Sequence, residues 1–224
     1  MNVSLPEGVP ELPEHLVAWL PEATASSWRT IAPLVPPGAY LAGGTGLTVH
    51  LLHRVSHDLD FMFPHDIDLP ELRDIFDRAG RLFVTRLDDA TLNAVFDGTR
   101  VQFLQASNQK QLAPTSSVGG IEVASIEDIT AMKLKVILDR GELRDYFDLM
   151  EIDRRSAVPM EEGISLFLER YGVGSDDHRV TMLIRALGYL ADVADDPALP
   201  ADRVDIETYW ARRQPELADR LGRF

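Results

Sequence analysis

The hydrophobic pattern of this 224-residue sequence changes its period near residue 115, and that change constrains the fold more than any other feature. Before this point, apolar and polar residues mostly alternate, as at Leu59, Phe61 and Phe63, which is typical of a half-buried strand. Asp97-Gly98 predicts a tight hairpin. Strands are expected at residues 39–42, 57–63, 81–88, 91–98 and 99–105, and helices within 11–35 and at 45–53 and 69–80.

Beyond residue 115 the apolar residues recur at helical spacing. After an expected loop at 114–120 and a brief strand at 121–124, helices are predicted at residues 126–139, 143–154, 160–171, 177–193 and 203–220. The sequence therefore predicts an α/β fold with two domains. A mixed, strongly twisted sheet is expected in residues 1–118, a mainly helical bundle in residues 119–224, and a cleft between the two.

The composition of the chain excludes some classes of protein and disfavours some binding partners. The chain contains no cysteine for disulfides or thiolate metal sites, and no apolar run is long enough to span a bilayer. The acidic, proline-rich N-terminus has no basic or apolar region, so we expect no signal peptide and a cytoplasmic protein. A net charge of −14 argues against indiscriminate nucleic-acid binding, and it suits a protein that binds a divalent metal ion.

A pair of aspartates follows a glycine-rich turn in the first domain. Asp58 and Asp60 are two residues apart on an expected strand, so their side chains should share one face. Upstream, Gly43 and Gly44 lie between a strand and a helix, where backbone N–H groups and a helix N-terminus can bind an anion. One interpretation is a solvated strand end after a plain turn. The other is a site for Mg²⁺ and a nucleoside triphosphate, because Mg²⁺ is bound by one or two carboxylates plus substrate phosphates.

A second group of charged residues lies on helices of the second domain. Lys133 projects from the apolar stripe that Ile129, Met132, Val136 and their neighbours form along the helix at 126–139. Lysines are seldom buried without a partner, so Lys133 either extends to a nearby surface or contacts a phosphate across the cleft. Asp145 and Asp148 share a face of the next helix with Leu149 and Ile152. They form either a salt-bridged helix start with Arg140 or Arg144, or a cluster beside Lys133.

These two segments resemble the nucleotidyltransferases of the DNA polymerase β-like superfamily, and more narrowly the AbiEii/MenT-type toxin nucleotidyltransferases. The first family motif is a GGT-L turn, an HR-S segment and a DLDF strand, matched here by Gly43-Gly44-Thr45 with Leu47, His53-Arg54 with Ser56, and Asp58-Leu59-Asp60-Phe61. Leu52 stands where a glycine is common. The second motif is a lysine on a capped helix followed by R-g-x-x-R-D-x-x-D, matched by Lys133, Arg140, Arg144, Asp145 and Asp148. The two motifs frame roughly residues 40–150.

The resemblance implies an activity and its participants. A nucleoside monophosphate would move from an NTP to an acceptor hydroxyl, with release of pyrophosphate. In this family the acceptor is commonly the 3′ end of tRNA, the effect is growth arrest, and the usual partner is an antitoxin encoded beside the toxin. Acceptors that are small molecules or protein side chains remain an alternative, which the charge of −14 favours over RNA.

The resemblance also implies roles for individual residues. Asp58 and Asp60 would hold Mg²⁺, which bridges the NTP phosphates. Gly43, Gly44, Thr45 and Ser56 would contact the phosphates, while Arg54 and Arg144 would position the phosphates or the acceptor strand. Lys133 would offset charge that develops in the transition state. Asp145 or Asp148 would orient Lys133 or help to activate the acceptor hydroxyl.

Position 102 departs from the pattern of the wider superfamily, and the histidines of the first motif raise the question of a zinc site. Many polymerase β-like enzymes carry a third carboxylate on a later central strand, where this sequence has Gln102. An amide is neither a general base nor a charged metal ligand. Three interpretations follow: Asp145 or Asp148 replaces that carboxylate, the reaction relies on positioning and electrostatics, or the protein is a non-catalytic binding module. A zinc site formed by His50, His53 and His57 is disfavoured, because His57 lies beyond the helix that carries the other two.

Overall fold

The computed structural model describes residues 10–221, and these divide into two compact units. Within the described residues, the first unit comprises residues 10–109 and 114–125, and the second comprises residues 110–113 and 126–221. The boundary expected at residue 118 falls inside a hairpin whose two strands both belong to the first unit. We expect no signal peptide in the N-terminal segment. Most of that segment, residues 1–9, lies outside the described part of the chain.

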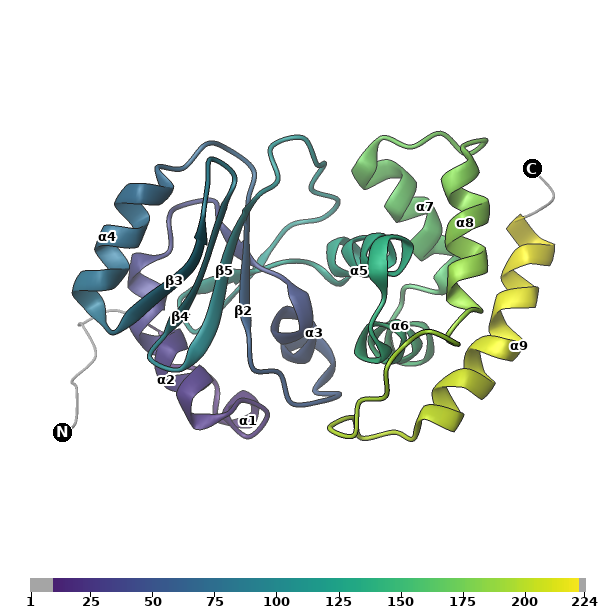
Figure 1. Ribbon diagram of the computed structural model, residues 1–224, viewed down its shortest axis with the longest axis horizontal. Helices are drawn as coiled ribbons and strands as arrows, with labels where there is room; N and C mark the ends of the chain where they lie inside the picture. The colour runs from purple at the N-terminus through teal and green to yellow at the C-terminus, as the bar shows by residue number, and fades with distance from the viewer. Residues whose placement is uncertain (1–9, 222–224) are drawn as a thin grey trace. The chain divides into compact units, whose positions relative to one another are not determined.

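The first unit is built around a mixed seven-stranded sheet with the strand order β3-β4-β5-β2-β1-β7-β6. Figure 1 shows β3, β4, β5 and β2 side by side. Strand β2 runs parallel to β5 and antiparallel to β1, while β1 runs parallel to β7. The strands are β1 (Tyr40–Leu41), β2 (Leu59–Phe63), β3 (Leu82–Leu87), β4 (Thr91–Phe96), β5 (Thr99–Gln105), β6 (Ser116–Val118) and β7 (Ile121–Val123). The helices are α1 (Glu14–Val17), α2 (Glu22–Ile31), the 3-10 helix η1 (Ala32–Leu34), α3 (Gly43–Leu51) and α4 (Leu69–Ala79).

Alternation along the strands gives the sheet one apolar face. Leu59, Phe61 and Phe63 are fully buried, as the alternating pattern predicts, and Phe61 stacks on Phe103 of β5 with ring centroids 4.7 Å apart. Helices α1, α2 and α4 complete this core, for example through the fully buried Trp28. Figure 1 shows these helices together on one side of β3, β4, β5 and β2. The polar residues of the same strands therefore lie on the other face.

Two tight turns each connect the strands of a β-hairpin in this sheet. Asp97 and Gly98 both have positive φ, at 45° and 90°, and join β4 to β5 as predicted. The loop expected at 114–120 is wrong, because Ser116–Val118 pairs with Ile121–Val123 as strand β6. Gly119 and Gly120, with φ of 52° and 78°, form the two-residue turn between them. A pair of glycines permits this geometry at low cost, which explains how so short a hairpin forms.

The second unit is helical, as predicted. Helix α5 packs against α6, α7 and α8, and α9 packs against the same three helices. Trp210 of α9 is fully buried, and its indole N–H donates to the Tyr146 carbonyl at 3.1 Å. The helices are α5 (Ile126–Arg140), α6 (Leu143–Arg155), α7 (Met160–Tyr171), α8 (His178–Leu187) and α9 (Arg203–Leu221).

The helix expected at 177–193 is too long by six residues. Helix α8 ends at Leu187. The backbone N–H of Gly188 bonds to the Arg185 carbonyl, and a series of turns follows.

The apolar stripe predicted for α5 is also partly wrong, because Val136 is 37% exposed while Leu134 is fully buried. None of the helices in residues 10–221 is long and apolar enough to cross a membrane.

A buried clamp fixes residues 110–113 to the second unit. The Arg170 guanidinium forms an ion pair with Asp128 and also donates to the Lys110 carbonyl at 3.1 Å. The Asp128 carboxylate in turn accepts backbone N–H bonds from Leu112 and Ala113. Arg170 and Asp128 are at most 1% exposed. The polypeptide thus leaves the first unit after Gln109, is held by this ion pair, and returns to the first unit at Pro114.

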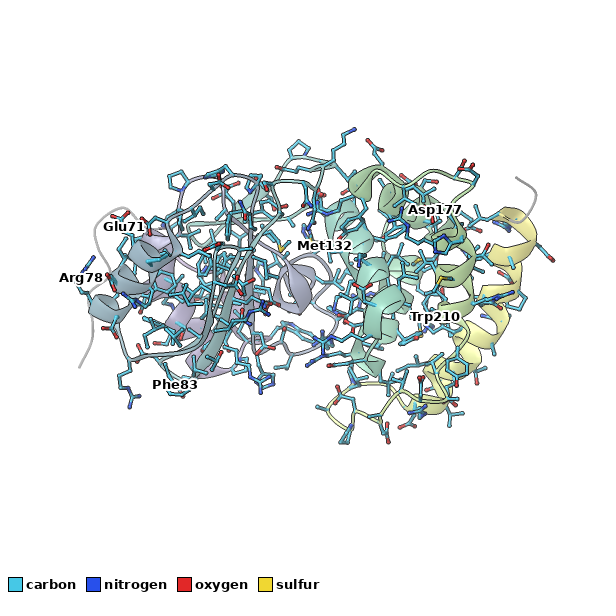
Figure 2. The ribbon with its side chains drawn as sticks, turned by 45° about the horizontal axis from the view of Figure 1, so that its top comes forward. Glu71, Arg78, Phe83, Met132, Asp177 and Trp210 are labelled. Carbon is cyan, nitrogen blue, oxygen red and sulfur yellow. The ribbon has the colours of Figure 1, made fainter. Side chains whose placement is uncertain are left out.

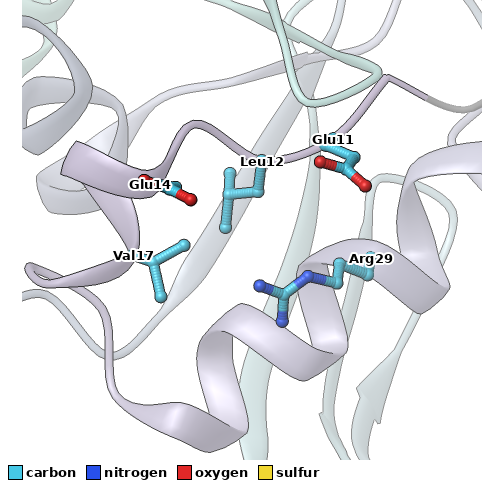
Figure 3. Close-up of a pocket in the computed structure, with 5 residues that line it drawn as sticks. All are labelled: Glu11, Leu12, Glu14, Val17 and Arg29. Carbon is cyan, nitrogen blue, oxygen red and sulfur yellow. The ribbon is translucent and has the colours of Figure 1, made fainter. Parts of the chain in front are cut away.

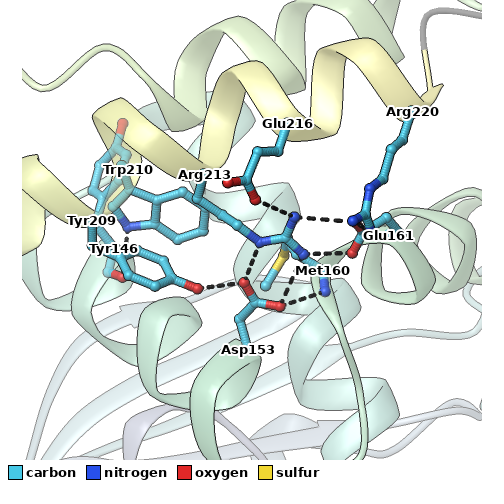
Figure 4. Close-up of polar contacts among 9 residues, drawn as sticks. All are labelled: Tyr146, Asp153, Met160, Glu161, Tyr209, Trp210, Arg213, Glu216 and Arg220. Atoms are coloured by element: carbon cyan, nitrogen blue, oxygen red, sulfur yellow. Dashed lines mark hydrogen bonds and ion pairs between the residues drawn. The ribbon is translucent and has the colours of Figure 1, made fainter.

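A second ion-pair network joins α6, α7 and α9 (Figure 4). Arg213 contacts Asp153 at 2.7 Å and Glu161 at 2.5 Å, and Arg220 contacts Glu161 at 2.8 Å. Asp153 also accepts the Met160 backbone N–H at 2.8 Å, which satisfies a donor at the start of α7. Because Arg213 is only 14% exposed, water screens these pairs less than ordinary surface pairs.

We expect the stability of the helical unit to fall in acid through Glu161. Hydrogen bonding from the Arg213 guanidinium holds the pKa of Glu161 below its usual value. The stabilisation is therefore complete above the unfolded-state pKa near ~4.3 and is lost as the pH falls through the lower folded-state pKa. Glu161→Gln should cost about 1–2 kcal/mol at pH 7 and flatten the decline of stability below about pH 4.5 in urea unfolding. The neighbouring exposed Glu162→Gln is the control, and an unchanged pH slope in Glu161→Gln would contradict the assignment.

Candidate functional site

Strand β1 leads directly into the glycine turn, and the turn opens helix α3. Gly43 has a φ of 63°, a conformation that L-residues other than glycine rarely adopt. A Cβ atom at Gly43 would lie 2.2 Å from Oδ2 of Asp60, so the carboxylate occupies the space that a side chain would need. The glycine is therefore required both by the backbone conformation and by the close approach of Asp60.

The second glycine faces the His-Arg-x-Ser segment. A Cβ atom at Gly44 would lie 2.6 Å from a guanidinium nitrogen of Arg54 and 2.9 Å from the hydroxyl of Ser56. Arg54 and Ser56 are both buried, at 9% and 5% exposed. Thr48 of α3 donates to the Arg54 carbonyl at 2.9 Å, which fixes this segment to the helix. The structure thus brings four of the expected nucleotide-binding residues together around one turn.

The two aspartates are anchored through their backbone. Asp58 immediately precedes β2, and Asp60 is the second residue of the strand. The Asp58 carbonyl accepts the hydroxyl of Thr45 at 2.5 Å, and the Asp60 carbonyl accepts the Ala42 N–H at 2.7 Å. Thr45 is fully buried, so its hydroxyl positions Asp58 rather than facing a ligand. Both aspartates are half-buried and lie beside the N-terminus of α3, where a helix favours anions.

Gly43→Ala should lower nucleotide transfer by at least about 100-fold, since a displacement of about 1 Å at a reacting group can have that effect. The added methyl group would push the Asp60 carboxylate out of position. Gly98→Ala is the matched control, because Gly98 also has a positive φ, of 90°, but no atom lies within 4 Å of its Cβ position. Both variants should lose stability through backbone strain. Equal activity in the two would show that strain, and not the contact with Asp60, is responsible.

The donor atoms beside this turn fit a hard divalent cation. Within residues 10–221, no group of three or more His, Asp or Glu side chains is arranged to hold a metal ion. Two carboxylates are nevertheless sufficient for Mg²⁺, which completes its coordination with water and substrate phosphates. Asp58 and Asp60 offer only oxygen ligands, next to helix N–H groups that favour phosphate. The site therefore suits a metal–nucleotide complex better than a free metal ion.

The second unit carries the remaining expected catalytic residues in one cluster. The Lys133 ammonium lies 2.7 Å from Oδ1 of Asp145 and 2.7 Å from Oδ2 of Asp148. Their side chains are 9%, 8% and 0% exposed. Asp145 also accepts the Glu142 backbone N–H at 3.0 Å, which fixes the start of α6. The expectation that the aspartates lie beside Lys133 is confirmed, and the alternative pairing with Arg144 is not observed, because Arg144 pairs with Glu142.

Gln102 is the direct neighbour of Asp60 across the sheet. The parallel register of β2 and β5 sets Asp60 opposite Gln102. The Gln102 amide donates to the Asn93 side chain on β4 at 2.8 Å. The amide thus lies beside the candidate metal ligand, at the position where the resemblance leads us to expect a carboxylate in many related enzymes. The contact with Asn93 was not predicted, although the Asp97-Gly98 turn fixes the register of β4 and β5 and sets Asn93 opposite Gln102.

Two other features of the first unit do not contribute to the candidate site: its three neighbouring histidines and a pocket beside α1 and α2. His50 contacts the Ala124 carbonyl at 2.8 Å, His53 is buried and His57 is exposed, so the three histidines do not converge. A pocket of 350 Å³ lies beside α1 and α2, lined by Glu11, Leu12, Glu14, Val17 and Arg29 (Figure 3). It contains none of the glycines or aspartates described above. The turn at Gly43-Gly44 and the cluster at Lys133 thus remain the candidate functional residues.

Comparison with known proteins gives a consistent result at the level of sequence. A family model described as the nucleotidyl transferase AbiEii toxin of type IV toxin–antitoxin systems matches residues 31–221. An uncharacterized protein of Aquifex aeolicus (strain VF5) is 28% identical over 174 residues, which cover 76% of this chain and 80% of that protein. The family match includes every residue of the two sequence motifs.

Solved structures share the fold. JHP933 from Helicobacter pylori superposes with a TM-score of 0.55 at 21% identity, covering 95% of this chain and 96% of its own. MenT4, a nucleotidyltransferase toxin from Mycobacterium tuberculosis H37Rv, superposes with a TM-score of 0.60 at 20% identity, covering 85% of this chain and 80% of its own. The nucleotidyltransferase-like α/β fold expected from the sequence is confirmed. Because the family model spans most of the chain, the protein belongs to the AbiEii family of toxins and is a nucleotidyltransferase.

Proposed function

We propose that this protein transfers a nucleoside monophosphate from an NTP to the 3′ end of tRNA in a Mg²⁺-dependent reaction. The observation that carries the proposal is the turn at Gly43-Gly44, where a side chain on either glycine would collide with Asp60 or with Arg54 and Ser56. This arrangement sets carboxylates for a cation and donors for phosphate oxygens side by side. Membership of the AbiEii family supports the same activity.

Residues of the first unit would bind the triphosphate. Asp58 and Asp60 would hold Mg²⁺, which when bound neutralises phosphate charge and fixes the geometry of the triphosphate. The N–H groups of Gly44 and Thr45, together with Ser56, would donate to phosphate oxygens. Arg54 would add a fixed positive charge beside the same turn. Gly43 would contribute through the space that it leaves for Asp60.

Residues of the second unit would stabilise the transition state. We assign to Lys133 the role of offsetting negative charge on the phosphoryl group. Asp148, whose side chain is fully buried, would orient Lys133 and not touch the substrate. Asp145 would share that task, since it already holds Lys133 and the start of α6. Arg144 is more exposed, at 41%, and suits a contact with the acceptor strand or its phosphates.

The reaction needs no covalent intermediate on the protein. The acceptor 3′ oxygen attacks the α-phosphorus, the bond from that phosphorus to the bridging oxygen of the β-phosphate breaks, and pyrophosphate leaves. The hydroxyl proton passes to water. Phosphoryl transfer of this kind depends mainly on positioning and electrostatic stabilisation, so a missing third carboxylate at Gln102 is compatible with activity. In the cell, a cognate antitoxin would be the partner, and the absence of cysteine supports a cytoplasmic location.

Label transfer is the direct test. Purified protein is incubated with Mg²⁺, each of the four labelled NTPs in turn, and total tRNA, and the RNA is separated on a denaturing gel. Labelled tRNA is expected with the wild type and not with Asp58→Ala. A tRNA with an oxidised 3′ end is the control for the acceptor, because it lacks the attacking hydroxyl.

Other outcomes identify other acceptors. The net charge of −14 favours a protein or small-molecule acceptor, so labelled protein or a labelled small product in place of tRNA would overturn the choice of acceptor while leaving the transfer reaction intact. Calorimetric titration of the protein with Mg²⁺ and NTP tests whether it binds the nucleotide at all. A wild type that shows neither label transfer nor metal-dependent NTP binding would overturn the proposal as a whole.

A further inference from the structure

The face of the sheet that carries Asp60 continues across β5 and β4 to the free edge at β3. Cross-strand register defines two rows of side chains on this face. In one row, Arg86 is opposite Asn93, Asn93 is opposite Gln102, and Gln102 is opposite Asp60. The row is therefore continuous from the candidate metal ligand to the edge strand. Three strand spacings of 4.7–4.9 Å make its length roughly 15 Å.

The neighbouring row holds an exposed aromatic side chain and an arginine. Phe83 is opposite Val95, and Val95 is opposite Arg100. Phe83 is 69% exposed, the most exposed of the large hydrophobic residues in the described part of the chain. Figure 2 shows Phe83 at the margin of the first unit, away from the labelled α4 residues Glu71 and Arg78. No partner in residues 10–221 explains an aromatic ring at this position.

Arginines gather on this face although the protein is strongly acidic. Arg81, Arg86 and Arg100 are all exposed. Arg81 and Arg86 form ion pairs with Asp97 and Asp88 at 3.5 Å and 2.7 Å, whereas the Arg100 guanidinium has no hydrogen bond or ion pair with another described residue. Exposed ion pairs contribute little, so a phosphate could replace either carboxylate.

The residue types favour single-stranded nucleic acid over a protein strand. A sheet face with an exposed aromatic ring and arginines binds single strands by stacking bases and contacting phosphates. Addition of a β-strand at the edge is disfavoured, because the register of β3 shifts between Val84 and Arg86 and arginines flank the strand. The adjacent amides of Asn93 and Gln102 can bond to the edges of unpaired bases.

We propose that the open face of β3, β4 and β5 binds the single-stranded 3′ end of the acceptor RNA. Phe83 stacks on a base, Arg86 and Arg100 contact the backbone phosphates, and the Asn93–Gln102 pair guides the strand toward Asp60. Gln102 thus has a positioning role at the place of the missing carboxylate. This inference rests on the proposed function, since it assigns the binding surface for the same acceptor.

Binding measurements with defined variants test this surface. The probe is a fluorescein-labelled single-stranded RNA of eight nucleotides, followed by anisotropy at several salt concentrations. Phe83→Ala should weaken binding about 10-fold, as expected for the loss of one stacked base. Arg100→Gln should weaken it and lower the salt slope by about 0.7. Neither change should alter calorimetric binding of Mg²⁺–NTP.

Matched controls separate a specific surface from general effects. Arg78→Gln removes an exposed arginine from α4, and Tyr189→Ala removes a 58% exposed aromatic ring from the second unit. Both controls should bind the RNA like the wild type. If Phe83→Ala and Arg100→Gln also bind and label RNA like the wild type, the surface is wrong while the tRNA reaction stands. If the wild type neither binds nor labels RNA, the proposed acceptor fails and this inference fails with it.

Discussion

Asp60→Asn is expected to reduce nucleotide transfer by about 1,000-fold, which corresponds to roughly 4 kcal/mol of lost transition-state stabilisation. Asparagine has nearly the same shape as aspartate and leaves intact the bond from the Ala42 N–H to the residue 60 carbonyl. It carries no charge, however, so one of the two carboxylates beside the phosphate-binding turn is lost. The fold should persist while metal-dependent NTP binding weakens.

The measurement combines label transfer with calorimetric titration of NTP in the presence and absence of Mg²⁺. Asp77→Asn is the control, because Asp77 is an exposed carboxylate on α4 of the same unit and the change in net charge is identical. An Asp60→Asn protein that keeps near wild-type transfer would remove Asp60 from the metal site. If the melting temperature of Asp60→Asn is lowered, its loss of nucleotide transfer results from impaired folding instead.

Lys133→Met is expected to destabilise the second unit by about 3–5 kcal/mol and to abolish transfer. Removal of the ammonium leaves Asp145 and Asp148 buried without their shared counter-charge, and an uncompensated buried charge has a cost of this size. Lys135→Met, on the same helix, removes an exposed lysine that pairs with Asp139 and should cost less than about 1 kcal/mol. Urea unfolding monitored by circular dichroism compares the two variants.

A triple variant separates the structural role of Lys133 from its catalytic role. In Lys133→Met with Asp145→Asn and Asp148→Asn, the buried cluster is neutral, so most of the lost stability should return. The amide oxygen of residue 145 can still accept the Glu142 N–H. Transfer should remain absent, because the variant lacks the ammonium to which we assign the offsetting of phosphoryl charge. Recovery of both stability and activity would show that Lys133 acts only in folding.

The sequence predicted the elements that carry strong local signals. The alternating residues of β2, the Asp97-Gly98 turn and the position of most helices were correct because each depends on neighbouring residues alone. The contact between Lys133 and its two aspartates was also predictable, since each charge lay on an otherwise apolar face of a helix. Strand β6 was missed, although Gly119-Gly120 is itself a hairpin signal.

Features that depend on long-range register were not predictable. Gly43 and Asp60 are distant in sequence, and only the pairing of β1 with β2 brings the carboxylate into the space beside the glycine. The row from Arg86 to Asp60 likewise depends on the pairing of β2 with β5, which could shift by two residues without changing the hydrophobic pattern. The end of α8 depends on one glycine, whose effect is weak inside an otherwise helical sequence.

The interlaced path of the chain has a consequence for biosynthesis. Strand β1 is synthesised early, but its parallel partner β7 is complete only when residue 123 has been added, after residues 110–113 of the other unit. A nascent chain that stops earlier exposes an unpaired edge at β1, directly beside the glycine turn. Translation products that end before β7 therefore lack a complete sheet beside the nucleotide-binding turn.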